Sequence, residues 1–183
     1  MQALFVEAPE AMLAERRRLG LDGGDEMWDG VLHVVPPPGG PHQRLGSRLL
    51  LALSPRADAA GLVASYETGL FRTDADYRVP DLLVCSPASA SDRGAEGAEL
   101  VVEIRSPGDE TYSKLPFYAA AGVREVLVVH PEDGRIELFR LAGETLLPVS
   151  GDEAGAVRSD VLGVRFVPGT PLGLTWDGGS AEI

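Results

Sequence analysis

Four short segments rich in valine and leucine limit the folds that this chain can adopt. They cover residues 62–66, 79–85, 100–105 and 126–130, and their length and β-branched content predict strands. A helical segment between the last two ends just before Gly122, which suits the left-handed position after a helix. With a helix before the first strand, the order is helix, three strands, helix, strand. This order predicts an α/β fold with one mixed central sheet flanked by helices.

Further elements are predicted on both sides of this core. The hairpin among them turns at Asp29–Gly30, and the longer helix is expected to end before Pro55. No linker or repeat divides the chain, so residues 1–183 are expected to form a single domain. The additional elements are a helix at 9–19, a hairpin at 27–32, a helix at 42–53, strands at 135–141 and 146–149, and weak strands at 161–176.

Composition restricts the class of protein. The chain is 44% hydrophobic and 24% charged, as in ordinary globular proteins. No apolar run reaches the roughly 20 residues of a membrane span, and Met1–Glu7 lacks the basic region of a signal peptide, so a cytoplasmic protein is expected. The single cysteine, Cys85, is expected to be a small buried residue. The net charge of −12 disfavours tight, sequence-specific DNA binding, because basic groups supply most affinity for phosphates.

Two of the apolar segments each contain one acidic residue, Asp81 and Glu103. A carboxylate in so apolar a strand is costly unless something compensates its charge. If the strands are neighbours, the two carboxylates meet, and a hard cation such as Mg²⁺ relieves their repulsion by taking oxygen ligands from both. Alternatively, each carboxylate pairs separately with a basic residue such as Arg105 or Lys114.

The same residues resemble a known family. Pro80–Asp81 followed by Glu103–Arg105 resembles the PD-(D/E)xK signature of restriction-endonuclease-like nucleases. The longer run formed by Val79–Val84, Val101–Pro107, Lys114, Tyr118 and Ala121–Val123 is similar to the Uma-two family of bacterial endonuclease-like proteins. The resemblance implies a restriction-endonuclease-like core with additional N- and C-terminal strands, and a hydrolase that cuts nucleic acid, with DNA as the expected partner.

The resemblance also implies a site. Its metal ligands would be Asp81 and Glu103, and its cofactor Mg²⁺, for which Mn²⁺ can substitute. Glu67 is either a further ligand or a solvated strand end. The signature has lysine where this chain has Arg105, a poor general base suited to contacting phosphate. Family members carry the lysine on the next helix, which makes Lys114 the group expected to orient or deprotonate water. Pro116 implies that this helix begins near Ser113 or is kinked.

These expectations give specific distances. Asp81 and Glu103 should have carboxylate oxygens within roughly 4–6 Å, and the Lys114 ammonium should lie within roughly 3–6 Å of the Glu103 carboxylate. Burial is expected to lower the pKa of Lys114. His42 could reach the site from the start of its helix, but a capping or surface role is expected. Tyr118 fits core packing as well as the site.

Three functions remain open. The first is a Mg²⁺-dependent nuclease or phosphodiesterase that acts on nucleic acid, as a homodimer by analogy with enzymes that cut both strands. The second is a catalytically inactive nuclease-like fold that serves as a binding or assembly module, which the acidic charge and Arg105 favour. The third is hydrolysis of a small phosphorylated molecule.

Overall fold

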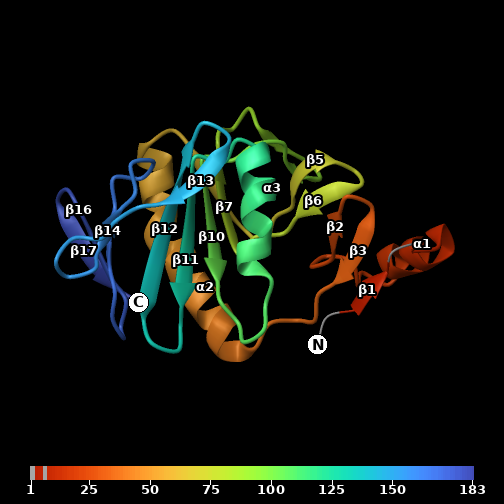
Figure 1. Cartoon of the computed structure of the whole chain (residues 1–183), viewed down its shortest axis with the longest axis horizontal. Helices are drawn as coiled ribbons and strands as arrows, with labels where there is room; N and C mark the ends of the chain where they lie inside the picture. Colours follow the sequence, from red (N-terminus) through yellow and green to blue (C-terminus); the bar gives the residue numbers. More distant parts are fainter. Residues whose placement is uncertain (1–2, 6–7) are drawn as a thin grey trace.

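A six-stranded mixed sheet forms the centre of the computed structural model, which describes residues 3–5 and 8–183 (Figure 1). β10 and β11 run parallel, and the other neighbouring pairs are antiparallel. In spatial order the strands are β13 (Thr145–Pro148), β12 (Arg135–Ala142), β11 (Glu125–His130), β10 (Leu100–Ile104), β7 (Leu82–Cys85) and β4 (Val63–Tyr66). The mixed central sheet predicted from the sequence is thereby confirmed.

Helices lie on opposite faces of this sheet, with α3 (Leu115–Ala120) on one and α2 (Gly40–Ala59) on the other (Figure 1). Side chains alternate along β10, so Val102 and Ile104 point toward α2 while Val101 packs with Phe117 and Tyr118. The sheet therefore has an apolar core on each face. The chain order α2, β4, β7, β10, α3, β11 also confirms the predicted order of elements.

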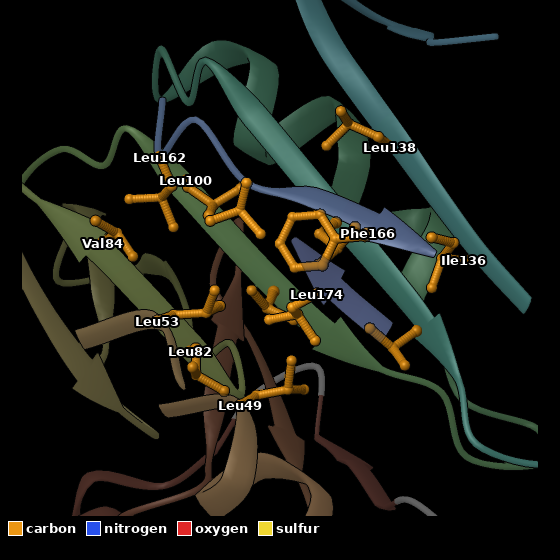
Figure 2. Packing of buried hydrophobic residues seen from close by; sticks show 14 of the residues in the cluster. Leu49, Leu53, Leu82, Val84, Leu100, Ile136, Leu138, Leu162, Phe166 and Leu174 are labelled. Atoms are coloured by element: carbon orange, nitrogen blue, oxygen red, sulfur yellow. The ribbon is translucent and has the colours of Figure 1, made fainter. Parts of the chain in front are cut away.

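The α2 face is closed by a separate C-terminal sheet. Phe166 and Leu174 from that sheet pack against Leu100 and Ile136 of the central sheet (Figure 2). All four side chains are buried, so the weak strand signals of the tail correspond to elements that the core requires. The strands of this sheet are β14 (Val157–Arg158), β15 (Arg165–Val167), β16 (Gly173–Trp176) and β17 (Gly179–Glu182).

A third sheet gathers most of the N-terminal strands, which corrects the expectation of a single sheet. Its β2–β3 hairpin turns at Asp29 and Gly30, both at positive φ, as the sequence predicted. The segment 70–78 adds two strands that were not predicted, because the acidic residues in its turn, Asp74 and Asp76, suggest a loop. The strands are β1 (Ala3–Phe5), β3 (Val31–Val34), β2 (Glu26–Trp28), β6 (Asp76–Arg78), β5 (Leu70–Thr73), β9 (Gly94–Ala95) and β8 (Ala90–Ser91).

The helices agree with the prediction except at the two ends of α2, which begins at Gly40 and not at His42 and also ends later than expected. The first, α1 (Glu10–Arg18), lies within the predicted segment 9–19. In contrast, α2 continues through Pro55 to Ala59. Pro55 is exposed, so the carbonyl that it leaves without an amide donor can bind water, while Leu53 and Ala57 continue the buried face. No helix in the described part of the chain is long and apolar enough to cross a membrane.

Candidate metal and catalytic site

Glu103 lies inside the apolar strand β10 and is 5% exposed. Alternation points its side chain toward α3, the same side as Val101. There the hydroxyl of Tyr118 donates a hydrogen bond to Oε1 of Glu103. The Lys114 ammonium lies 3.2 Å from Oε1 and 3.4 Å from Oε2. The buried carboxylate of Glu103 is thus stabilised by one hydroxyl and one ammonium group.

Asp81 does not lie in the middle of a strand, as the sequence analysis expected, but directly before β7. Pro80 cannot donate a ladder hydrogen bond, so the strand begins at Leu82. Because Leu82 pairs with Val102 in the antiparallel register, the next position places Asp81 opposite Glu103. Asp81 Oδ2 accepts a hydrogen bond of 2.6 Å from the backbone amide of Ile104. The predicted distance between the two carboxylates stays a prediction.

Burial makes both carboxylates costly to ionise. It raises the pKa of Asp81 above its ordinary value, against the lowering effect of the Ile104 amide. Burial also raises the pKa of Glu103, further supported by the Asp81 charge, although Lys114 acts in the opposite direction. Two such groups on neighbouring strands form a site whose negative charge a cation would compensate.

Lys114 is the only lysine in the sequence. It ends a 3₁₀ turn, Thr111–Lys114, and α3 begins at Leu115 with Pro116 in its first turn, close to the predicted start near Ser113. Its distance to Glu103 lies within the expected range. Burial would lower the pKa of Lys114, but the charges of Glu103 and Glu26 outweigh burial and raise it. The expected lowering of this pKa was therefore wrong, and the ammonium form is strongly favoured.

Glu26 is the acidic residue that the sequence analysis missed. It lies on β2 of the N-terminal sheet and is 1% exposed. Its Oε1 lies 2.8 Å from the Lys114 ammonium and accepts a hydrogen bond from the amide of Val79, while Oε2 accepts one from the indole of Trp28. Lys114 is thus shared between two glutamates that belong to different sheets.

His42 was expected to have a capping or surface role, but it lies beside Asp81. Its Nε2 is 3.5 Å from Asp81 Oδ1 and 3.0 Å from the carbonyl oxygen of Ile104. Because a carbonyl only accepts, Nε2 donates in this contact and carries a proton. Nδ1 is buried and has no hydrogen-bond partner among the described residues. A buried polar atom without a partner, close to the Asp81 carboxylate, leaves room for a further polar group such as water at this place.

Glu67 lies across the sheet from Asp81, but its side chain contacts Gln43. The register between Tyr66 and Leu82 continues to place Glu67 opposite Asp81, and the Glu67 amide donates to the Asp81 carbonyl. Glu67 is exposed, has a φ of 46°, and accepts a hydrogen bond of 2.7 Å from Gln43. Within residues 3–5 and 8–183, no three His, Cys, Asp or Glu side chains are already grouped as metal ligands.

Arg105 pairs with Asp109 at 3.0 Å, and its guanidinium lies 4.9 Å from the ring centroid of Tyr112. The alternation that would point it at the Glu103 side ends with β10 at Ile104. Arg105 instead lines a cleft of about 230 Å³ together with Ser106, His130 and Arg135. Cys85, as expected, is a buried apolar residue, 1% exposed, on the α3 face of the sheet.

Comparisons with known proteins show the family and the fold of this chain. Residues 22–168 match the model of the Uma2 family, described as a putative restriction endonuclease. A crystal structure of a putative nuclease belonging to DUF820 from Anabaena variabilis is similar, with 15% identity and a TM-score of 0.61 over 75% of this chain and 82% of that chain. This likeness confirms the α/β fold of nuclease type that the resemblance implied.

A second match is more remote. The cryo-EM structure of a DrdV–DNA complex has 13% identity and a TM-score of 0.37, over 58% of this chain and 10% of that chain. None of the curated proteins matches the sequence.

Proposed function

The chain belongs to the Uma2 family of restriction-endonuclease-like proteins, and on this premise we propose that it is a Mg²⁺-dependent nuclease that hydrolyses phosphodiester bonds of nucleic acid, with DNA as its substrate. One observation carries the proposal. The half-buried carboxylate of Asp81, directly before β7, lies opposite the buried carboxylate of Glu103 in the register of β7 and β10, and the only lysine lies against Glu103.

Asp81 and Glu103 are the residues that would hold the cation. Both present acidic oxygens, the donor type that Mg²⁺ and Mn²⁺ prefer. The Lys114 ammonium 3.2 Å from Glu103 shows that a positive charge is accommodated at this carboxylate. Glu67, across the sheet from Asp81, would serve as a further ligand if its side chain left Gln43. A divalent cation supplies activation of a water molecule and positive charge for the phosphate oxygens.

The remaining side chains have separate roles in this proposal. Lys114 stays protonated between two glutamates, so it acts as a donor that orients the attacking water or a phosphate oxygen, and not as the base. Tyr118 fixes the orientation of the Glu103 carboxylate through its hydroxyl. Arg105 contributes positive charge at the nearby cleft, where it would contact a phosphate of the substrate.

A catalytically inactive binding module is the second function that the chain supports. The net charge of −12 opposes binding of nucleic acid, and Arg105 is engaged by Asp109. Hydrolysis of a small phosphodiester avoids the objection from charge. These alternatives differ from the proposed nuclease in one measurable respect, which is metal-dependent cleavage of a polynucleotide.

A cleavage assay tests the proposal. The protein is incubated with labelled duplex DNA, single-stranded DNA, RNA and a chromogenic small phosphodiester, in Mn²⁺, Mg²⁺ or EDTA. We expect polynucleotide cleavage with either metal and none in EDTA or with Asp81→Asn. Asp74→Asn is the matched control, because the Asp74 side chain is 91% exposed and belongs to the β5–β6 turn. Cleavage of only the small phosphodiester, or of none of the substrates, would contradict the proposal.

The proposal treats residues 1–183 as one domain that acts as a homodimer in the cytoplasm. The dimer stays a prediction, based on the two strands of the proposed substrate. Sedimentation equilibrium of the protein alone and with duplex DNA checks it.

A further inference from the structure

Lys114 has two acidic partners, and a bound cation would disturb its contact with only one of them. Glu103 is one of the proposed metal ligands, whereas Glu26 lies on β2 of another sheet and is not one of them. A divalent cation on Glu103 would repel the ammonium and compete for the same oxygens. Lys114 can then keep its place near the metal only if its other partner retains it.

We propose that Glu26 is the positioning residue that holds Lys114 beside the metal site when a cation occupies Glu103. The inference rests on the proposed function for the identity of the ligands, but its geometry is independent of any reaction. Glu26 is the nearer partner, with Oε1 2.8 Å from the ammonium, against 3.2 Å for Glu103. It does not contact the reacting groups itself.

Glu26 is built as a fixed anchor. Its carboxylate accepts hydrogen bonds from the Val79 amide at 3.0 Å and from the Trp28 indole at 2.8 Å, in addition to the ion pair. Trp28 is itself held between the His33 ring, stacked at 4.2 Å, and the guanidinium of Arg78, also at 4.2 Å. A carboxylate with two other donors and 2% side-chain exposure has little freedom to follow a moving ammonium group.

The arrangement explains why a separate sheet reaches the site. The Val79 amide that binds Glu26 lies two residues before Asp81, so the segment before β7 carries both the anchor contact and a proposed metal ligand. The hairpin β2–β3 thereby fixes Lys114 relative to Asp81. The placement of the lysine depends on the N-terminal sheet as well as on the central sheet.

The unique lysine makes a direct test simple. Protein labelled with ¹⁵N-lysine gives a single side-chain ammonium signal, which is visible only while burial and ion pairing slow its exchange with water. We compare wild type, Glu26→Gln and Glu144→Gln with and without saturating Mg²⁺. Glu144 is an exposed glutamate in the β12–β13 turn and serves as the matched control.

Wild type and Glu144→Gln should keep the signal in both conditions. Glu26→Gln should keep it without Mg²⁺, through Glu103, and lose it when Mg²⁺ binds. Its kcat in the cleavage assay should fall by about 10–100-fold, with KM and Mg²⁺ affinity within about twofold of wild type. In a Lys114→Ala background, Glu26→Gln should have no further effect on kcat. Retention of the signal by Glu26→Gln in bound Mg²⁺ would overturn the inference.

A further variant covers failure of the Glu26 variant to fold or of the protein to bind metal. Glu103→Gln, measured without Mg²⁺, should keep the ammonium signal because Glu26 remains, and its loss would refute the anchor. If wild type shows no Mg²⁺ binding while Glu103→Gln keeps the signal, the proposed function fails and the anchoring role of Glu26 stands.

Discussion

Tyr118 Oη donates a hydrogen bond to Oε1 of Glu103, from the buried face of α3 to the middle of β10. Both groups are almost completely buried, so the hydroxyl and the carboxylate depend on each other for hydrogen bonding. The contact joins the helix that follows Lys114 to the strand that carries the proposed metal ligand. It therefore links the packing of the core to the geometry of the site.

Tyr118→Phe should destabilise the protein. The change leaves a buried carboxylate without its hydroxyl donor, and hydrogen bonds to charged groups contribute about 1.5–3 kcal/mol. Urea unfolding in EDTA should show a loss of this size in the free energy of unfolding. Tyr112→Phe is the control, since the Tyr112 hydroxyl donates a hydrogen bond to Glu137 and Tyr112 is 39% exposed. Equal losses in the two variants would show that the buried hydrogen bond to Glu103 stabilises the protein no more than an exposed one does.

Asp81→Asn should leave the metal-free protein equally stable or more stable. The raised pKa means that burial disfavours the charged carboxylate, and each unit of such a shift corresponds to about 1.4 kcal/mol. The amide oxygen of asparagine can still accept the hydrogen bond from Ile104. Thermal unfolding in EDTA near pH 8 measures the effect, with Asp74→Asn as the exposed control. Marked destabilisation by Asp81→Asn alone would indicate a structural partner for Asp81 instead of a metal.

The stability of the metal-free protein should depend on pH because of Asp81 and Glu103. The folded-state pKa values of Asp81 and Glu103 lie above their ordinary values of 3.8 and 4.5. The folded state therefore holds more protons than the unfolded state between the ordinary and the raised values, and stability contributed by these groups falls as pH rises through that window. Above the raised pKa values this contribution should level off.

Denaturant unfolding in EDTA from pH 4 to pH 9 measures this dependence in wild type and in Asp81→Asn/Glu103→Gln. The decline should be smaller in the double variant, which lacks both titrating groups. Identical profiles would contradict the raised pKa values.

Lys114 and Arg105 should differ in the kinetic parameter that they control. Lys114→Ala should lower kcat by about 10²–10³-fold, the range for loss of a preorganised hydrogen-bond donor. Arg105→Ala should mainly raise KM, because it removes a phosphate contact at the cleft. Arg124→Ala, an exposed arginine paired with Glu99, provides the control in the Mn²⁺ cleavage assay. An unchanged rate in Lys114→Ala would remove lysine from the mechanism.

The sequence predicted the parts of the site that depend on local pattern. Glu103 was recognisable because it is a charged residue in a short strand that is otherwise apolar. The strands β10 and β7 do lie side by side. The role of Lys114 was predicted from the family resemblance. The strands of the central sheet were predicted for the same reason, since each is a short apolar run bounded by turns.

The missed residues depend on tertiary contacts that local patterns do not encode. Glu26 follows Asp22 and Asp25 in a segment that suggests an exposed turn, and only the packing of the N-terminal sheet against Lys114 buries it. His42 begins α2 in a pattern that equally fits a surface residue, yet the helix start meets Asp81. The division into three sheets likewise depends on long-range pairing, such as β2 with β6.

Metal binding tests the central claim most directly. Isothermal titration with Mn²⁺, free of substrate, is applied to wild type, Asp81→Asn, Glu103→Gln and the exposed control Glu144→Gln. We predict saturable binding to wild type and the control, and affinity weakened by about tenfold or more in each of the other two variants. Absence of binding by wild type, or equal affinity in all four proteins, would contradict the assignment of Asp81 and Glu103 as metal ligands.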